Sequence, residues 1–140
     1  MKNKKGFTLI ELLAIIVILA IIAVITVPII LNIIDNAKSG AVTNSVHGYK
    51  DAINKYYLST LSSGGVIADF DGDYTINAEG NIVKNNTEYE IDVSGNKPNG
   101  GTLSIVNKSI VEGCVQIDGY YVTIHEGTIG QALKGECSNS

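Results

Sequence analysis

The side chains of this 140-residue chain that first suggest catalysis are its two histidines and Cys114. The two histidines, His47 and His125, could each form a thiol–imidazole pair with Cys114. No supporting acid or nucleophile motif accompanies them, so packed or solvent-exposed structural histidines are the simpler interpretation. The sequence also contains no phosphate-binding loop and no zinc-ligand spacing. We predict that the chain is not an enzyme, has no catalytic residues and uses no cofactor.

One acidic stretch, Asp69-Phe70-Asp71-Gly72-Asp73, places three carboxylates two residues apart beside a glycine. Oxygen-rich loops of this kind can hold calcium. The stretch lacks the later glutamate of an EF-hand, so a solvated acidic loop is the default interpretation. We predict no metal site and keep calcium binding by Asp69–Asp73 as the alternative.

A further carboxylate, Glu11, stands at the head of a long apolar stretch. The run from Leu12 to Leu31 is interrupted only by Thr26 and Pro28. A charged side chain costs roughly 2.5–3.5 kcal/mol at the middle of a bilayer and less near its surface. A carboxylate in a membrane-length segment is therefore a candidate functional residue.

The element that must position Glu11 is a membrane-length helix. About 20 apolar residues cross a bilayer as a helix, and Phe7–Leu31 spans twenty-five residues. Lysines at positions 2, 4 and 5 precede this stretch, and the next positive charge is Lys38. The positive-inside rule then predicts a cytoplasmic N-terminus and an extracytoplasmic C-terminal domain.

Two simpler membrane signals fit this segment less well. A cleaved secretory signal needs a shorter apolar core followed by a small-residue cleavage site, whereas Gly6 precedes the apolar run. A plain signal-anchor helix explains the lysines and the length but not Glu11.

The remainder of the chain is acidic. Residues 35–140 hold seven lysines against thirteen carboxylates, a balance of −6. An acidic surface repels the phosphate backbone of nucleic acids. We therefore predict no specific nucleic-acid contact.

The chain has two cysteines, Cys114 and Cys137. In an extracytoplasmic domain such a pair is expected to form a disulfide. Closing a loop of about 24 residues would stabilise the fold by roughly 3 kcal/mol in the chain-entropy model. Two unrelated buried thiols are the alternative.

Helical periodicity continues beyond the apolar stretch. Apolar residues recur every three to five positions as far as Leu61, with lysines, aspartates and asparagines between them. The segment ends at Ser62-Ser63-Gly64-Gly65, which predicts one helix from about Phe7 to Leu61. Pro28 lies inside it, lacks an N–H and crowds the carbonyl of Val24, so we expect a kink there.

The rest of the chain predicts a small antiparallel sheet. Asp118-Gly119 is a strong two-residue hairpin signal, since a type I′ turn needs positive φ at both positions. The predicted strands are Tyr74–Ile76, Tyr89–Val93, Thr102–Val106, Ile110–Ile117 and Tyr120–Ile124. A sheet of about three to five strands, packed on the amphipathic half of the helix, would bury both apolar faces and give an α+β fold.

The N-terminal residues resemble those of a known family. Lys5-Gly6-Phe7-Thr8-Leu9-Ile10-Glu11-Leu12-Leu13, followed by an apolar run with Pro28, resembles the class III signal and N-terminal helix of type IV pilins and pseudopilins. The resemblance covers roughly residues 1–35. Many members of the family have a glycine where this chain has Ala20, which favours helix.

The resemblance implies roles for individual residues. A prepilin peptidase would cut between Gly6 and Phe7 on the cytoplasmic side and methylate the new amine of Phe7. Glu11 would pair with the ammonium of Phe7 in a neighbouring subunit and fix the axial register, as a single buried polar residue does in coiled coils. Other implied partners are identical or related pilin subunits, an assembly platform and a cytoplasmic ATPase.

The resemblance also implies an organisation. We expect a leader peptide at 1–6, a transmembrane and assembly helix at 7–34, and an extracytoplasmic pilin domain at 35–140. Within that domain we expect a helix at 35–62, a sheet at about 73–126 and a disulfide-closed segment at 114–137. The chain would span the membrane once before assembly and belong to an extracellular filament afterwards.

We predict a prepilin, the precursor of a structural subunit of a type IV pilus or a related filament. A pseudopilin of type II secretion, or of a competence system for DNA uptake, is the alternative. A membrane-anchored domain that never polymerises is a more distant one.

Overall fold

The structure, a computed structural model, describes residues 5–67 and 69–138 and has an α+β fold. One long helix, α1 (Leu9–Ser62), precedes a single antiparallel sheet of eight strands. The strands are β1 (Gly72–Ile76), β2 (Ile82–Lys84), β3 (Thr87–Tyr89), β4 (Gly100–Val106), β5 (Ser109–Ile117), β6 (Tyr120–His125), β7 (Thr128–Ile129) and β8 (Leu133–Lys134). The predicted fold class is confirmed, but the sheet has more strands than expected.

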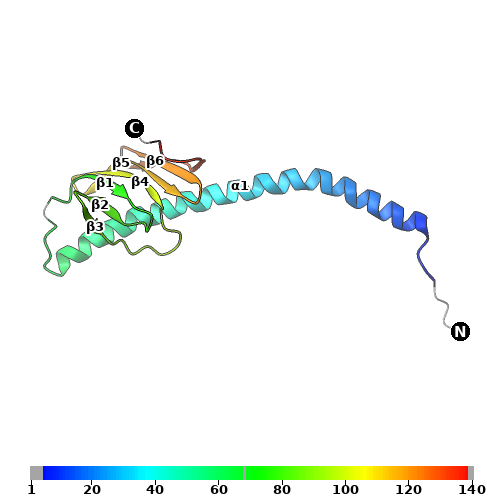
Figure 1. Ribbon diagram of the computed structural model, residues 1–140, viewed down its shortest axis with the longest axis horizontal. Helices are drawn as coiled ribbons and strands as arrows, with labels where there is room; N and C mark the ends of the chain where they lie inside the picture. The colour runs from blue at the N-terminus through cyan, green and yellow to red at the C-terminus, as the bar shows by residue number, and fades with distance from the viewer. Residues whose placement is uncertain (1–4, 68, 139–140) are drawn as a thin grey trace. The chain divides into compact units, whose positions relative to one another are not determined.

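The chain divides into two compact units, Met1–Ala37 and Lys38–Ser140. The described part of the first unit consists of a short N-terminal segment and the apolar half of α1. The second unit contains the amphipathic end of α1 and the whole sheet, which lies against that end of the helix (Figure 1).

The sheet is built from neighbouring hairpins. Its hydrogen-bonded order is β3-β2-β1-β4-β5-β6-β7, and β8 pairs with the start of β6. Strands that follow one another in the chain are adjacent in the sheet, except that β4 pairs with β1 instead of β3 and β8 pairs with β6 instead of β7. This antiparallel order leaves one face for α1 and the other for solvent.

Four hairpins turn through only two residues, and both residues have positive φ. These turns are Asn85-Asn86, Asn107-Lys108, Asp118-Gly119 and Glu126-Gly127. Type I′ turns match the twist of antiparallel strands, which explains their repeated use. The sequence predicted only Asp118-Gly119, which is confirmed. Asparagine tolerates positive φ well, but Lys108 and Glu126 carry no such preference.

The core lies between one stripe of α1 and the inner face of the sheet. Val42, Val46, Tyr49 and Ile53 follow helical spacing, and each is at most 4% exposed. They join a cluster of inward-facing strand residues: Tyr74, Ile76, Ile82, Leu103, Ile105, Ile110, Val115, Ile117, Tyr120, Val122 and Ile124. The buried hydroxyl of Tyr49 donates a hydrogen bond of 2.8 Å to the carbonyl of Gly80, so its burial leaves no unpaired polar atom.

One predicted strand is wrong. The sequence favoured a strand at Tyr89–Val93, but β3 ends at Tyr89 and the residues after it lie outside the sheet. Apolar and polar residues alternate here because Ile91 and Val93 are buried in the core, although the segment pairs with no strand. The N–H of Ile91 donates to the side chain of Asn81 at 3.2 Å rather than to another strand.

The C-terminal segment is fastened to α1 by hydrogen bonds. The Ser39 hydroxyl donates to the carbonyl of Ala132 at 2.8 Å, and the N–H of Ala132 donates to the Thr43 hydroxyl at 3.1 Å. Farther along α1, the Lys50 ammonium donates to the carbonyl of Gly127 at 2.9 Å. These bonds hold residues 127–132 against the helix on one side of the core.

Glycines in the second unit serve different purposes. At Gly101, φ is +126°, and a Cβ would lie 2.0 Å from the carbonyl oxygen of Cys114, so only glycine fits between β4 and β5. At Gly48, inside α1, a Cβ would meet no atom of another described element within 4 Å. The fold of the second unit therefore requires Gly101 but not Gly48.

This contrast gives a stability prediction. Glycine in a helix interior costs about 1 kcal/mol relative to alanine, so Gly48→Ala should raise the free energy of unfolding by about that amount. Denaturant unfolding of the full-length protein in detergent would measure it. Gly101→Ala is the control and should lower the free energy because of its backbone clash. An unchanged or lowered stability of Gly48→Ala would contradict the interpretation.

Candidate functional site

The predicted cleavage site lies just before α1, in backbone that forms neither helix nor strand. Residues 5–8 form neither helix nor strand, and α1 begins at Leu9 rather than at the predicted Phe7. The Phe7 side chain is 79% exposed, and a Cβ at Gly6 would meet nothing within 4 Å. Of the predicted leader, residues 1–4 lie outside the described residues. The Gly6–Phe7 bond is thus exposed and lies outside regular secondary structure.

Glu11 and Thr8 are joined by two hydrogen bonds at the first turn of α1. The N–H of Thr8 donates to Glu11 Oε2 at 3.0 Å, and the N–H of Glu11 donates to the Thr8 hydroxyl at 3.3 Å. This reciprocal pair is a capping box, in which two backbone donors that the helix leaves free are satisfied. The pattern Thr-x-x-Glu before an apolar run was the available signal, and the sequence reasoning missed it.

The capping box changes the description of Glu11. The sequence suggested a carboxylate without a local partner, whereas Oε2 accepts a hydrogen bond from its own chain. A carboxylate in the first helical turn is also favoured by the helix dipole. In the described structure the second oxygen, Oε1, makes no hydrogen bond. Glu11 is therefore held in place by Thr8 and keeps one oxygen for another donor.

Within the described part of the first unit, the apolar half of α1 leaves its large side chains exposed. Large apolar side chains from Leu9 to Ile34 are each between 43% and 83% exposed. The helix is long and apolar enough to cross a membrane, judged by length and composition. Burying this surface in lipid or against other helices would therefore contribute strongly to stability.

Pro28 interrupts the hydrogen bonding of this half but not the helix. Helical structure is continuous on both sides of Pro28. The Thr26 hydroxyl donates to the carbonyl of Ile22, which adds a side-chain bond one turn before the proline. A kink at Pro28 remains a prediction, because the missing N–H leaves the carbonyl of Val24 without its helical partner.

The acidic stretch Asp69–Asp73 is organised around an ammonium group. Lys84 Nζ donates to the carbonyls of Asp69 and Asp71, at 2.7 and 2.5 Å, and lies 3.3 Å from Asp69 Oδ2. The Lys84 side chain is only 13% exposed, and its ammonium sits 5.6 Å from the centroid of the Tyr74 ring. Lys84 thus places a positive charge against two backbone carbonyls of the acidic stretch and against the carboxylate of Asp69.

The carboxylate of Asp71 binds the hairpin turn at Asn107-Lys108. The N–H groups of Lys108 and Asn107 each donate to its carboxylate at 2.8 Å. These bonds hold the pKa of Asp71 below its ordinary value of 3.8, and the bond from Lys108 has the largest effect. No three histidine, cysteine, aspartate or glutamate side chains are grouped as metal ligands within residues 5–67 and 69–138.

The lowered pKa of Asp71 predicts a pH dependence. Its contribution to stability is fully present above the unfolded pKa of 3.8 and is lost as the pH falls through the lower folded pKa. Asp71→Asn should therefore unfold at a lower temperature than wild type near neutral pH, and the gap should narrow in acid. Calorimetry across this range measures the gap. The exposed Asp92→Asn is the control, and a gap independent of pH would contradict the role of the charge.

Neither histidine can form a thiol–imidazole pair with Cys114, whose sulfur is in a disulfide. His47 lies on the exposed side of α1. His125 Nδ1 lies 2.9 Å from Glu112 Oε1 at the sheet surface. Hydrogen bonds from the N–H of Glu126, which has the largest effect, and from the His125 ring lower the pKa of Glu112. The alternative of a thiol–imidazole pair is wrong, because Cys114 has no free thiol.

Cys114 and Cys137 form a disulfide, as the sequence predicted. It joins β5 to the segment after β8 across a sequence separation of 23. The N–H of Cys137 also donates to the side chain of Gln116 at 3.4 Å. The last described residues are therefore tied to a central strand.

Comparison with known proteins bears on the N-terminal segment alone. Residues 1–27 match the family described as the prokaryotic N-terminal methylation motif. A search of curated proteins and a search of solved structures each found no match. The matched range contains Gly6, Phe7 and Glu11 and ends just before Pro28. The chain therefore carries the class III signal of type IV pilins at residues 1–27, which include the start of α1, and its fold is α+β and pilin-like.

Proposed function

We propose that this chain is a prepilin, the precursor of a structural subunit of a type IV pilus or a related filament. It is cleaved after Gly6 and methylated on the new amine of Phe7. The observation that carries the proposal is the N-terminal methylation motif at residues 1–27, at the head of a helix whose large apolar side chains are exposed. The chain acts as a building unit and catalyses no reaction.

The geometry of the first residues supports processing by a prepilin peptidase. The Gly6–Phe7 bond lies two residues before α1, in backbone without regular structure. Gly6 has no side chain to obstruct an enzyme that approaches the backbone. With the lysine leader on the cytoplasmic side, the cut occurs there and the sheet-bearing unit stays outside.

Cleavage after Gly6 would create a positively charged partner for Glu11, the new ammonium of Phe7. The new ammonium of Phe7 is a cation, and charge-assisted hydrogen bonds are roughly twice as strong as neutral ones. Glu11 already uses Oε2 for the N–H of Thr8, so Oε1 is available to the ammonium of a neighbouring subunit. An ion pair in apolar surroundings forms only in one register, which would fix the axial position of each arriving subunit.

Assembly exchanges one apolar environment for another. Before assembly the apolar half of α1 lies in the membrane, and afterwards it packs against the same segment of other subunits. Lipid and helix surfaces are similarly apolar, so the exchange is guided by packing and by the Glu11 pair. A cytoplasmic ATPase and an assembly platform in the membrane supply the work, and the sheet-bearing unit forms the filament surface.

Shearing filaments from native cells tests the proposal. Wild-type chain should appear in the sheared surface fraction, starting at Phe7. Gly6→Val, which places a branched side chain at the cut, should remain in the membrane fraction at precursor length. Lys5→Gln changes the neighbouring leader residue and is the control that should still assemble. Uncut chain within filaments, or wild-type chain confined to membranes while the cells make filaments, would overturn the proposal.

A further inference from the structure

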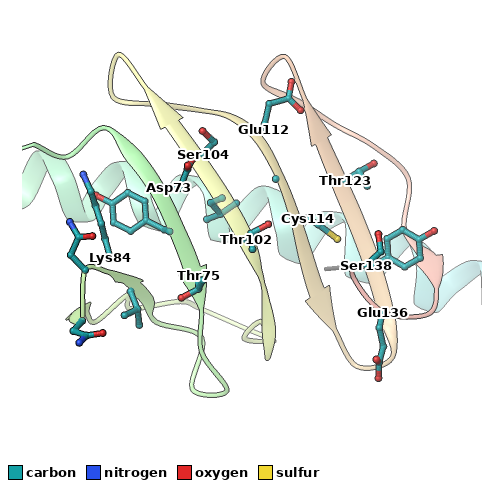
Figure 2. A pocket seen from close by; sticks show the side chains of 17 residues that line it. Asp73, Thr75, Lys84, Thr102, Ser104, Glu112, Cys114, Thr123, Glu136 and Ser138 are labelled. Carbon is teal, nitrogen blue, oxygen red and sulfur yellow. The ribbon is translucent and has the colours of Figure 1, made fainter. Parts of the chain in front are cut away.

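The face of the sheet turned away from α1 carries an open groove of about 850 Å³ (Figure 2). It crosses β1, β4, β5 and β6. Lys84 lies at one side, and Glu136 and Ser138 lie at the other. Residues that alternate with the buried core residues of these strands form its floor. The groove therefore belongs to the solvent face of the sheet and is formed by paired strands.

Strand register arranges polar groups in rows along the floor. Asp73 pairs with Ser104, and Ser104 pairs with Glu112, which places the three in one row across β1, β4 and β5. Strands are spaced about 4.7–4.9 Å apart, so the Cα atoms of Asp73 and Glu112 are separated by roughly 10 Å. The next row presents the hydroxyls of Thr102 and Thr123.

Much of this hydrogen-bonding capacity is unused. Among the described residues, the side chains of Asp73, Ser104, Thr102 and Thr123 make no hydrogen bond to the rest of the chain. Both oxygens of the Glu112 carboxylate already have one partner, Oε1 the N–H of Glu126 and Oε2 the ring of His125, but half of this side chain stays exposed. These carboxylates and hydroxyls therefore face solvent and can form further hydrogen bonds with a ligand.

The charge of the groove is negative. Asp73, Glu112 and Glu136 line it, and Lys84 is the one lysine among its lining residues. The Lys84 ammonium is already bonded to the Asp69–Asp71 backbone. A complementary partner must therefore bring positive charge and hydrogen-bond donors, which excludes acidic and purely apolar ligands.

We propose that this groove binds an extended segment of a partner protein in which two lysines are separated by two residues. In a polyproline II segment, residues three apart point to the same side and lie about 9.3 Å apart, which matches the spacing of Asp73 and Glu112. The backbone of such a segment has no internal hydrogen bonds, and the floor hydroxyls can donate to its carbonyls. Tyr121 also lines the groove and offers its ring to proline.

The inference rests on the proposed function only in placing the groove outside the cytoplasm. Binding requires the folded second unit and not the filament. Loss of assembly with normal binding would therefore count against the proposed function alone, and the reverse would count against this inference alone.

Fluorescence anisotropy on the full-length protein in detergent micelles tests the inference. The probe is a labelled peptide with the core Lys-Pro-Pro-Lys, compared at low salt with a peptide of the same composition whose lysines are adjacent. We expect the first to bind more tightly. Asp73→Asn with Glu112→Gln should weaken its binding by about fivefold or more, and added salt should weaken it further.

The control removes the same charge elsewhere. Glu90→Gln with Asp92→Asn changes two exposed carboxylates that do not line the groove, and it should leave binding nearly unchanged. Equal weakening by both double variants, or equal affinity for both peptides, would reduce the effect to bulk charge and overturn the inference. Tight binding of a neutral oligosaccharide with no binding of either peptide would overturn it in favour of a glycan.

Discussion

Glu11→Ala should abolish filament assembly while the protein still inserts in the membrane. Removing one member of a buried ion pair leaves the other charge unpaired and costs about 3–5 kcal/mol. In an assembly equilibrium, that is a loss of roughly a hundredfold or more. The expected result is wild-type amounts of chain in the membrane fraction and none in sheared filaments.

Two further variants separate the ion pair from the capping box. Glutamine also serves in a capping box, so Glu11→Gln keeps the hydrogen bond to Thr8 but removes the charge, and it should fail to assemble. Thr8→Val removes the hydroxyl of the cap but keeps the carboxylate, and it should assemble. Normal filaments from Glu11→Gln would rule out pairing with the Phe7 ammonium.

The second large effect is expected at the disulfide. Closing the loop between Cys114 and Cys137 should stabilise the fold by about 3 kcal/mol in the chain-entropy model. Reduction, or the double variant Cys114→Ser with Cys137→Ser, should lower the free energy of unfolding by that amount. Part of the C-terminal segment would stay bound through the contacts of Ala132 with Ser39 and Thr43.

Denaturant unfolding of the full-length protein, with and without reductant, measures this effect. The double variant is its own control, because reductant should not change its midpoint. A wild-type midpoint that is insensitive to complete reduction would show that the native contacts alone determine stability. The loop-closure argument would then be wrong for this chain.

Local and strongly periodic features could be predicted from the sequence. The run from Leu12 to Leu31 specifies a helix, and Ser62-Ser63-Gly64-Gly65 ends it as α1 ends in the structure. Asp118-Gly119 specified the hairpin between β5 and β6, because the residue types meet the φ requirement directly. Each of these depends on neighbours in sequence.

Short and long-range features could not be predicted. β2 has three residues, too few for a period to emerge, and two turns place lysine or glutamate at positive φ against local preference. The role of Lys84 depends on contact with Asp69 and Asp71, which lie 15 and 13 residues earlier. Only the pairing of strands brings that ammonium to the acidic stretch, so composition alone suggested calcium.

In the candidate sites too, features built from neighbours in sequence could be predicted, and those built from distant residues could not. Gly6, Phe7 and Glu11 lie in one contiguous segment, and the family match covers all three. The capping box of Thr8 and Glu11 was also readable, since its spacing is local. The groove on the outer sheet face was not, because Asp73, Ser104 and Glu112 meet only through register.

The mass of the N-terminal peptide, taken from the protein in its native cells, is the most direct measurement. A chain that begins at Phe7 and carries the mass of one added methyl group is the expected result, and it would establish prepilin processing. A chain that retains Met1, or one cut after the apolar stretch, would contradict the proposed function. The protein would then be a plain membrane anchor in the first case and a secreted domain in the second.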